Sequence, residues 1–330
     1  MPSNSYTSLL ELHTALQSRM VASRTKLGEI RTSANKHDAL KTNSLCVFAA
    51  GSLGRLEAGE QSDFDVFMIG HSPEKQKLKI SPISRLEEYE AFASLIQINQ
   101  LLEFPKFSGD GRFLKVYELD EMKYATGSPR DDSENLFTAR MLLLLESQPI
   151  TNQALYEQAI NEITAYYFRD GIGKDNFRPL FLLNDILRYW RTLCLNYEGH
   201  RNDPNRPWFR KNLNLKFSRK LTVFSTVLAI LAGMANDSNS FKKLCNLTPL
   251  ERLALALDNI DDPNLLNDFQ TLLNNYELFL RGKEKSLVSD EAPKQKKRRY
   301  AEAATEFDLF FHKAIESPFV DGVLRRYILI

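Results

Sequence analysis

Two aspartates separated by one residue, Asp63 and Asp65, follow a Gly-Ser pair, Gly51 and Ser52, within the stretch VFAAGSLGRLEAGEQSDFDVFMI. Residues i and i+2 of an extended chain point to the same face, so the two carboxylates are expected side by side. Two like charges at that spacing favour a cation between them, and an oxygen-rich pair suits Mg²⁺ held together with phosphate groups. Gly51 and Ser52 complement such a site, because small residues let backbone N–H groups and a hydroxyl approach a phosphate.

This stretch resembles the signature of the polymerase-β-like nucleotidyltransferases, in which a Gly-Ser turn after one strand is followed by a strand carrying Asp-x-Asp. It is most similar to the amino-terminal domain of PII-protein uridylyltransferases and their stand-alone relatives, on Gly51-Ser52, Gly54-Arg55, Glu57 and Ser62-Asp63-Phe64-Asp65. Ser52 departs from the second glycine that is common in the uridylyltransferases. The chain of 330 residues also leaves no room for their phosphohydrolase and regulatory domains. The resemblance is sharp over residues 47–69 and looser up to residue 197.

The resemblance implies transfer of a nucleoside monophosphate from a nucleoside triphosphate to an acceptor hydroxyl, with release of pyrophosphate. In such a reaction Asp63 and Asp65 would hold Mg²⁺ in a two-metal site. Gly51 and Ser52 would bind the β- and γ-phosphates. Arg55 could add a bidentate phosphate contact, and an ion pair with a neighbouring glutamate (Glu57 or Glu60) is the alternative.

Active members of this superfamily add a third acid from a later strand, which helps to deprotonate the attacking hydroxyl. Two residues are candidates here: Asp110, at the entrance to a predicted strand, and Glu118, near the end of that strand. Asp110 aligns with an acidic position of the family and is favoured. A plain Asp-Gly turn with Gly111 explains the same residue.

Basic residues cluster over 201–220 and 294–299. The first cluster includes Lys216 and Lys220, which lead into a predicted helix and are the candidate contacts to the triphosphate. Either cluster could meet an acidic or nucleic-acid acceptor. A solvated basic loop and a solubilising run are the alternatives.

The elements that must position these residues follow from hydrophobic periodicity. Helix is expected over 1–42 and 85–102, and strands are expected over 44–50, 65–69 and 112–119. Further helices are expected at 137–146, 152–169, 179–197, 218–236, 249–257, 265–281 and 301–317. The predicted fold class is α+β: a nucleotidyltransferase domain with a small mixed β-sheet over 1–130, followed by an all-α, substrate-selecting domain over 131–330. A charged linker is expected at 282–299.

The composition sets limits on the class of protein. With 43 basic and 42 acidic residues the net charge is +1, which excludes a dominant nucleic-acid-binding coat or an acidic tail. The apolar stretch 221–235 is shorter than the roughly 20 residues that span a bilayer, so no membrane association is expected. Three scattered cysteines without a CxxC pair, and no apolar leader, favour the cytoplasm.

The sequence encodes neither the base nor the acceptor. Uridylyl and adenylyl transfer remain open, and so do protein, RNA and small-molecule acceptors. The alternative function is a non-catalytic module that senses nucleotides or binds a partner in a regulatory or toxin–antitoxin-like defence system.

Overall fold

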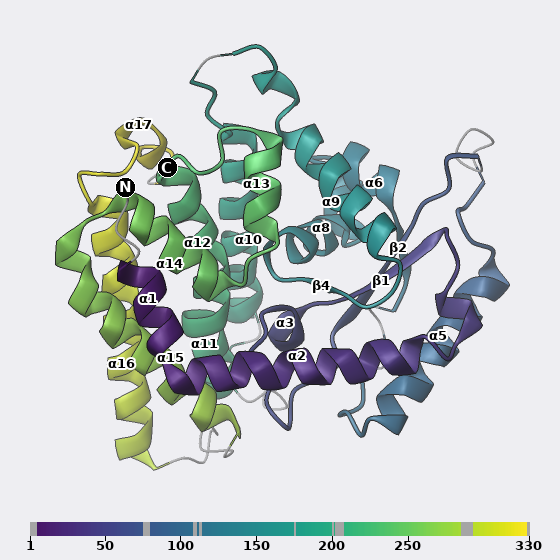
Figure 1. Ribbon diagram of the computed structural model, residues 1–330, viewed down its shortest axis with the longest axis horizontal. Helices are drawn as coiled ribbons and strands as arrows, with labels where there is room; N and C mark the ends of the chain where they lie inside the picture. Colours follow the sequence, from purple (N-terminus) through teal and green to yellow (C-terminus); the bar gives the residue numbers. More distant parts are fainter. Residues whose placement is uncertain are drawn as a thin grey trace. The chain divides into compact units, whose positions relative to one another are not determined.

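The computed structural model (Figure 1) describes residues 5–74, 80–107, 111, 114–174, 176–199, 201, 208–284 and 293–328. The chain forms two compact units. The sheet unit is Ser18–Tyr166, and the helical unit combines Met1–Gln17 with Tyr167–Ile330. The domain boundary expected at residue 130 therefore lies inside the sheet unit.

A four-stranded mixed sheet forms the centre of the sheet unit, in the order β3-β2-β1-β4. The strands are β1 (Leu45–Ala49), β2 (Val66–Gly70), β3 (Val116–Glu118) and β4 (Gln148–Pro149). β1 pairs antiparallel with both β2 and β4, whereas β2 and β3 are parallel. The small mixed sheet in a largely helical chain confirms the α+β class. Within the described part of the third expected strand, 114–119, only Val116–Glu118 forms a strand, and residues 112 and 113 lie outside the described part of the chain. β4 was not expected.

Pairing of β4 with β1 explains why the sheet unit extends past residue 130. Ala49 lies opposite Gln148, so the chain returns to the sheet after α8. The helices of this unit are α2 (Thr14–Ala34), α3 (Gly51–Gly54), α5 (Arg85–Leu101), α6 (Leu119–Tyr124), α7 (Pro129–Ser133), α8 (Leu136–Leu145) and α9 (Gln153–Tyr167), with the 3₁₀ turn η1 (Asp38–Leu40). α2 begins in the helical unit and α9 ends there.

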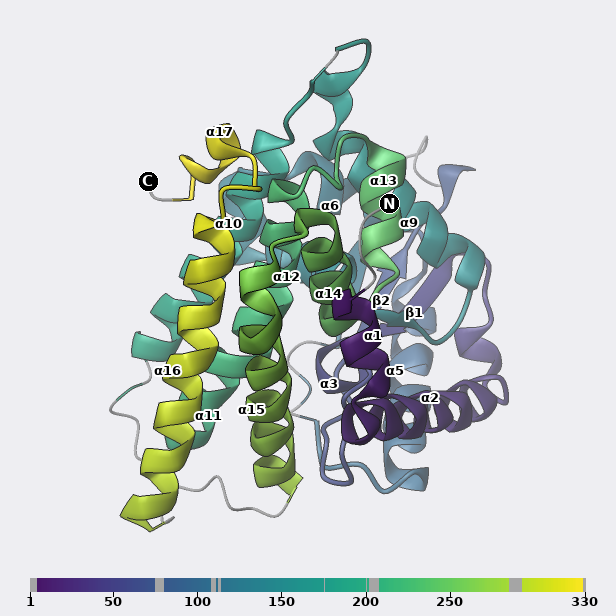
Figure 2. The same ribbon diagram turned by 60° about the vertical axis from the view of Figure 1, so that its left-hand side comes forward.

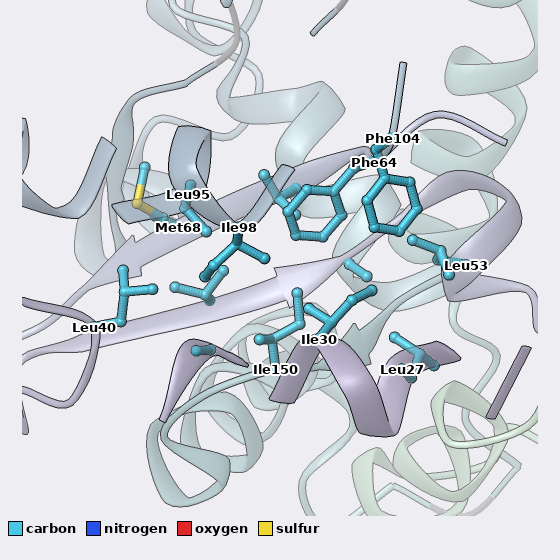
Figure 3. Packing of buried hydrophobic residues seen from close by; sticks show 14 of the residues in the cluster. Leu27, Ile30, Leu40, Leu53, Phe64, Met68, Leu95, Ile98, Phe104 and Ile150 are labelled. Atoms are coloured by element: carbon cyan, nitrogen blue, oxygen red, sulfur yellow. The ribbon is translucent and has the colours of Figure 1, made fainter. Parts of the chain in front are cut away.

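Helices cover both faces of the sheet, and β1 and β2 are therefore buried along their whole length. One face packs with α2 and α5, where Leu27 and Ile98 join the same apolar cluster as Met68 (Figure 3). On the other face, Phe48 meets Tyr156 of α9 with ring centroids 6.4 Å apart. Alternate residues of a strand point to opposite faces, so strands enclosed on both sides become continuous apolar runs such as LCVFA.

The helical unit is built around α12 (Lys220–Leu231), which is buried over nearly its whole length because almost every residue from Leu221 onward is apolar or small. The other helices are α1 (Ser5–Leu12), α10 (Leu180–Gly199), α11 (Trp208–Asn214), α13 (Ser238–Cys245), α14 (Pro249–Ile260), α15 (Leu266–Glu284), α16 (Lys294–Glu316) and α17 (Gly322–Arg325), with the short 3₁₀ turns η3 (Arg169–Gly171) and η5 (Pro263–Leu265). α1 packs on α14, and α15 runs beside α16 (Figure 2).

Two expectations for the helical unit differ from the structure. The expected linker 282–299 overlaps helix at both ends, because α15 continues to Glu284 and α16 already begins at Lys294. The first two residues of the helix expected over 218–236 belong to a π-helical segment, Leu215–Arg219, and the α-helix that follows ends at Leu231. In the described part of the chain, no helix combines the length and the apolar character needed to cross a membrane.

Candidate functional site

The Gly-Ser turn and the Asp-x-Asp segment meet at the end of β1. The Ala50 N–H donates to the Asp65 carbonyl oxygen at 2.9 Å, so the pairing of the two strands continues to the base of the turn. Gly51 adopts a φ of +62°, and a Cβ atom built on it would lie 2.4 Å from Oδ2 of Asp65. Glycine is therefore required at residue 51 twice, for its backbone conformation and for direct contact with the Asp65 carboxylate.

Ser52 lies in α3, a single helical turn that starts at Gly51. Its carbonyl oxygen accepts from the Glu57 N–H at 2.9 Å, which fixes the chain after the turn. The first N–H groups of a helix have no partner within the helix and carry partial positive charge. In α3 these groups belong to the Gly-Ser pair, next to the carboxylate of Asp65.

The extended segment before β2 anchors the two aspartates through the residue between them. Phe64 is buried, and its ring stacks on Phe104 with centroids 5.0 Å apart. Asp63 is exposed and Asp65 is half-buried. Burial of Phe64 between two less buried aspartates fits the alternating directions of side chains along an extended chain.

Arg55 has a different role from the phosphate contact that was expected of it. The side chain is buried, and its guanidinium donates to Glu57 at 2.5 and 2.8 Å and to Glu146 at 2.6 Å. The ion pair with Glu57, the alternative reading of the sequence, is present. Arg55 therefore connects the loop after α3 to the end of α8.

Glu146 supports the turn in two ways and was not recognised from the sequence as part of the site. Its carboxylate pairs with Arg55, and its carbonyl oxygen lies 2.0 Å from where a Cβ atom on Gly54 would be. Only glycine lets α3 pack this closely on the backbone of Glu146. The available signal was a glutamate at the end of the apolar run MLLLLE.

The two candidates for a third acid have different outcomes. Glu118 of β3 lies opposite Gly70 of β2, which runs parallel to β3. Gly70 is five positions after Asp65 in the sequence. At about 3.3 Å per residue, Glu118 is about 16 Å along the strands from Asp65, which is too far to share a metal ion with it. Asp110 lies outside the described residues. Its neighbour Gly111 lines a small cavity of about 50 Å³ together with Asp65 and Leu114.

The two lysines expected to contact the triphosphate belong to the helical unit. Lys216 is exposed within the π-helical segment. Lys220 forms an ion pair with Asp308 of α16, and its ammonium group is 5.4 Å from the centre of the Trp190 ring. The basic cluster 294–299 forms the start of α16, where Arg298 pairs with Glu302 at 2.8 Å.

The residues at the turn suit a magnesium ion that is shared with a substrate. Among the described residues, no group of three or more histidine, cysteine, aspartate or glutamate side chains is arranged to enclose a metal ion. Mg²⁺ is usually held by one or two carboxylates, with phosphates and water completing its shell. Asp63 and Asp65 match that mode of binding.

Neither a scan against models of known protein families nor a search of curated proteins finds a match to this chain.

Proposed function

We propose that the sheet unit is the catalytic unit of a Mg²⁺-dependent nucleotidyltransferase, which transfers a nucleoside monophosphate from a nucleoside triphosphate to a hydroxyl group. The contact between Gly51 and the Asp65 carboxylate carries this proposal. It joins the N–H groups at the start of α3 to a carboxylate that suits a magnesium ion. A phosphate chain requires both features at one place.

Each residue of the site then has a definite task. Asp63 and Asp65 hold the metal ion. The backbone at Gly51 and the Ser52 hydroxyl bind the terminal phosphates, and the N–H groups that start α3 offset their negative charge. When bound, magnesium neutralises charge on the triphosphate and orients it for in-line displacement. Arg55 and Glu146 act indirectly, because they hold the turn in place without contacting the substrate.

The proposed reaction breaks the bond between the α- and β-phosphates. The acceptor hydroxyl oxygen forms a new bond to the α-phosphorus, pyrophosphate leaves, and the hydroxyl proton passes to a base. Asp110, which precedes the cavity-lining Gly111, is our candidate for that base. Uridylyl and adenylyl transfer, and protein, RNA or small-molecule acceptors, all fit this chemistry.

The decisive experiment offers the purified full-length chain each of the four labelled nucleoside triphosphates, with Mg²⁺ and cell extract. We expect one triphosphate to release pyrophosphate and to label an acceptor. Asp63→Asn and Asp65→Asn should reduce both signals to background, because an amide no longer supplies an anionic metal ligand. Glu90→Gln, at an exposed position of α5, is the matched control and should retain full activity.

Normal turnover in either aspartate variant would contradict the proposal. Magnesium-dependent triphosphate binding without pyrophosphate release, lost in the same variants, would instead identify the non-catalytic nucleotide-sensing module. Circular dichroism and thermal unfolding of each variant show whether a loss of signal reflects the site or the fold.

A further inference from the structure

The helical unit contains a pocket of about 220 Å³ that the proposed reaction does not use. Residues from α10, α11 and the π-helical segment line it: Leu193, Asn196, Tyr197, Trp208, Lys211, Asn214, Leu215 and Arg219. This volume is below the range of about 300–1,000 Å³ for drug-sized ligands. The pocket therefore suits a compact ligand, smaller than most drug-sized molecules.

The backbone around the pocket is unusual. Leu215–Arg219 forms a π-helix between α11 and α12. This geometry is rare in proteins, and where it occurs it is often at a functional site. Within this segment, Phe217 is buried and stacks on Phe279 with centroids 4.7 Å apart. The core thus fixes Phe217, while Leu215 and Arg219 on either side of it line the pocket.

One wall of the pocket is aromatic. The rings of Tyr197 and Trp208 lie 5.7 Å apart at an angle of 39°. The guanidinium of Arg201 is 5.7 Å from the centre of the Trp208 ring. Aromatic side chains arranged in this way provide a stacking surface for a planar ligand.

Nε1 of Trp208 and Oδ1 of Asn214 are buried and lack hydrogen-bond partners among the described residues. The first can only donate a hydrogen bond and the second can only accept one. Leaving such atoms unsatisfied is costly, and native proteins do so rarely. A ligand that fills the pocket and both accepts and donates a hydrogen bond would remove this cost.

The described residues that line the pocket carry positive charge. Lys211 and Arg219 contribute cations, and none of these described lining residues is acidic. A ligand with an anionic group is therefore favoured over a neutral or cationic one.

From these features we infer that the pocket binds a planar heteroaromatic ring that carries an anionic group, and that nucleoside monophosphates are the ligand class that fits it best. The base stacks on the ring of Tyr197 and meets Trp208 at its edge, where it accepts from the indole N–H, and it donates to Oδ1 of Asn214. The phosphate lies toward Lys211 and Arg219. This inference goes beyond the proposed function, because the site uses neither Asp63 and Asp65 nor a metal ion.

The test measures binding of AMP, GMP, UMP and CMP to the full-length chain by calorimetry in the presence of EDTA. We expect at least one monophosphate to bind, and ribose 5-phosphate and inorganic phosphate to bind much more weakly. Trp208→Phe keeps the ring and removes the N–H, whereas Asn214→Leu removes the acceptor. Each should weaken binding about fivefold to tenfold, the typical worth of one hydrogen bond.

Lys211→Met separates recognition of the base from that of the phosphate. It should weaken binding of the monophosphate and leave the affinity for the parent nucleoside unchanged. Lys243→Met, at an exposed position of α13, is the matched control and should bind normally. Asp63→Asn should also bind normally, so failure of this site and failure of the proposed reaction are distinguishable.

The wild-type chain offers a second readout that does not depend on the folding of a variant. It contains two tryptophans, Trp190 and Trp208, and therefore two indole N–H resonances. We expect one to shift on addition of the monophosphate. If none of the four monophosphates binds in the presence of EDTA, the inference is overturned. Unchanged affinity in both pocket variants, or equal affinity for inorganic phosphate, would do the same.

Discussion

Replacing Arg55 by methionine removes the cation that pairs with Glu57 and Glu146 in a buried contact. The side chains of the three residues are 5%, 7% and 0% exposed, so neither carboxylate can regain solvation without a local rearrangement. Methionine keeps much of the packing volume of the arginine stem. The substitution therefore tests the charge more than the shape.

The expected cost follows from the burial of the glutamates. Breaking a buried ion pair by removing one partner costs about 3–5 kcal/mol, because an uncompensated charge is left inside. In a unit of this size each kcal/mol lowers the melting temperature by about 2–4 °C, so a fall of about 6–20 °C is expected. Since Glu146 also contacts Gly54, pyrophosphate release should fall with stability even at temperatures where the chain remains folded.

The assay is thermal and urea unfolding of Arg55→Met beside the triple variant Arg55→Met, Glu57→Gln, Glu146→Gln. Neutral amides remove the buried charge, and the triple variant should regain most of the lost stability. A single variant within about 1 kcal/mol of wild type would refute the electrostatic reasoning. So would a triple variant that is no more stable than the single one.

Two further predictions concern the turn and a helix cap. Gly51→Ala should abolish pyrophosphate release, because its Cβ displaces the Asp65 carboxylate. Gly127→Ala also has a positive φ, but its Cβ meets no atom within 4 Å, so it should lose only about 1 kcal/mol of stability and no activity. Asp237 caps α13, and hydrogen bonds from Ser240 lower the pKa of its carboxyl group. Asp237→Ala should therefore destabilise α13 by about 1 kcal/mol at pH 7, which is measured as faster amide hydrogen exchange in that helix. Because the pKa of Asp237 is lower in the folded chain than its unfolded value of about 3.9, the carboxylate stabilises α13 at any pH above that value. The stability difference between the wild type and Asp237→Ala should therefore shrink and vanish as the pH falls below about 3.9.

The elements of the site were predictable because they depend on local patterns. The apolar runs around Val47 and Met68 are enclosed strands, and the Gly-Ser and Asp-x-Asp spacing placed Gly51 near Asp65. Phe64 is buried between the two aspartates, as an alternation of side-chain directions along an extended chain would place it. The nucleotidyltransferase assignment itself stays a prediction.

The features that the sequence did not reveal depend on contacts between distant segments. Arg55 and Glu146 are 91 residues apart, and no periodicity connects them. The boundary near residue 130 marked a real change from strands to helices, but β4 brings the chain back to β1 after it. Lys294–Arg299 read as a linker because it lacks apolar residues. This segment forms the polar first turns of α16, and the buried residues of that helix begin only at Tyr300.

The division of the chain also sets an order of events during synthesis. The sheet unit is one continuous segment and is complete once residue 166 has emerged. α1 must wait, because the Tyr6 N–H bonds to Asp258, 252 residues later. At about 5–20 residues per second, that delay is about 13–50 s. The sheet unit can therefore reach its native structure while the first helix of the chain still lacks the surface on which it packs.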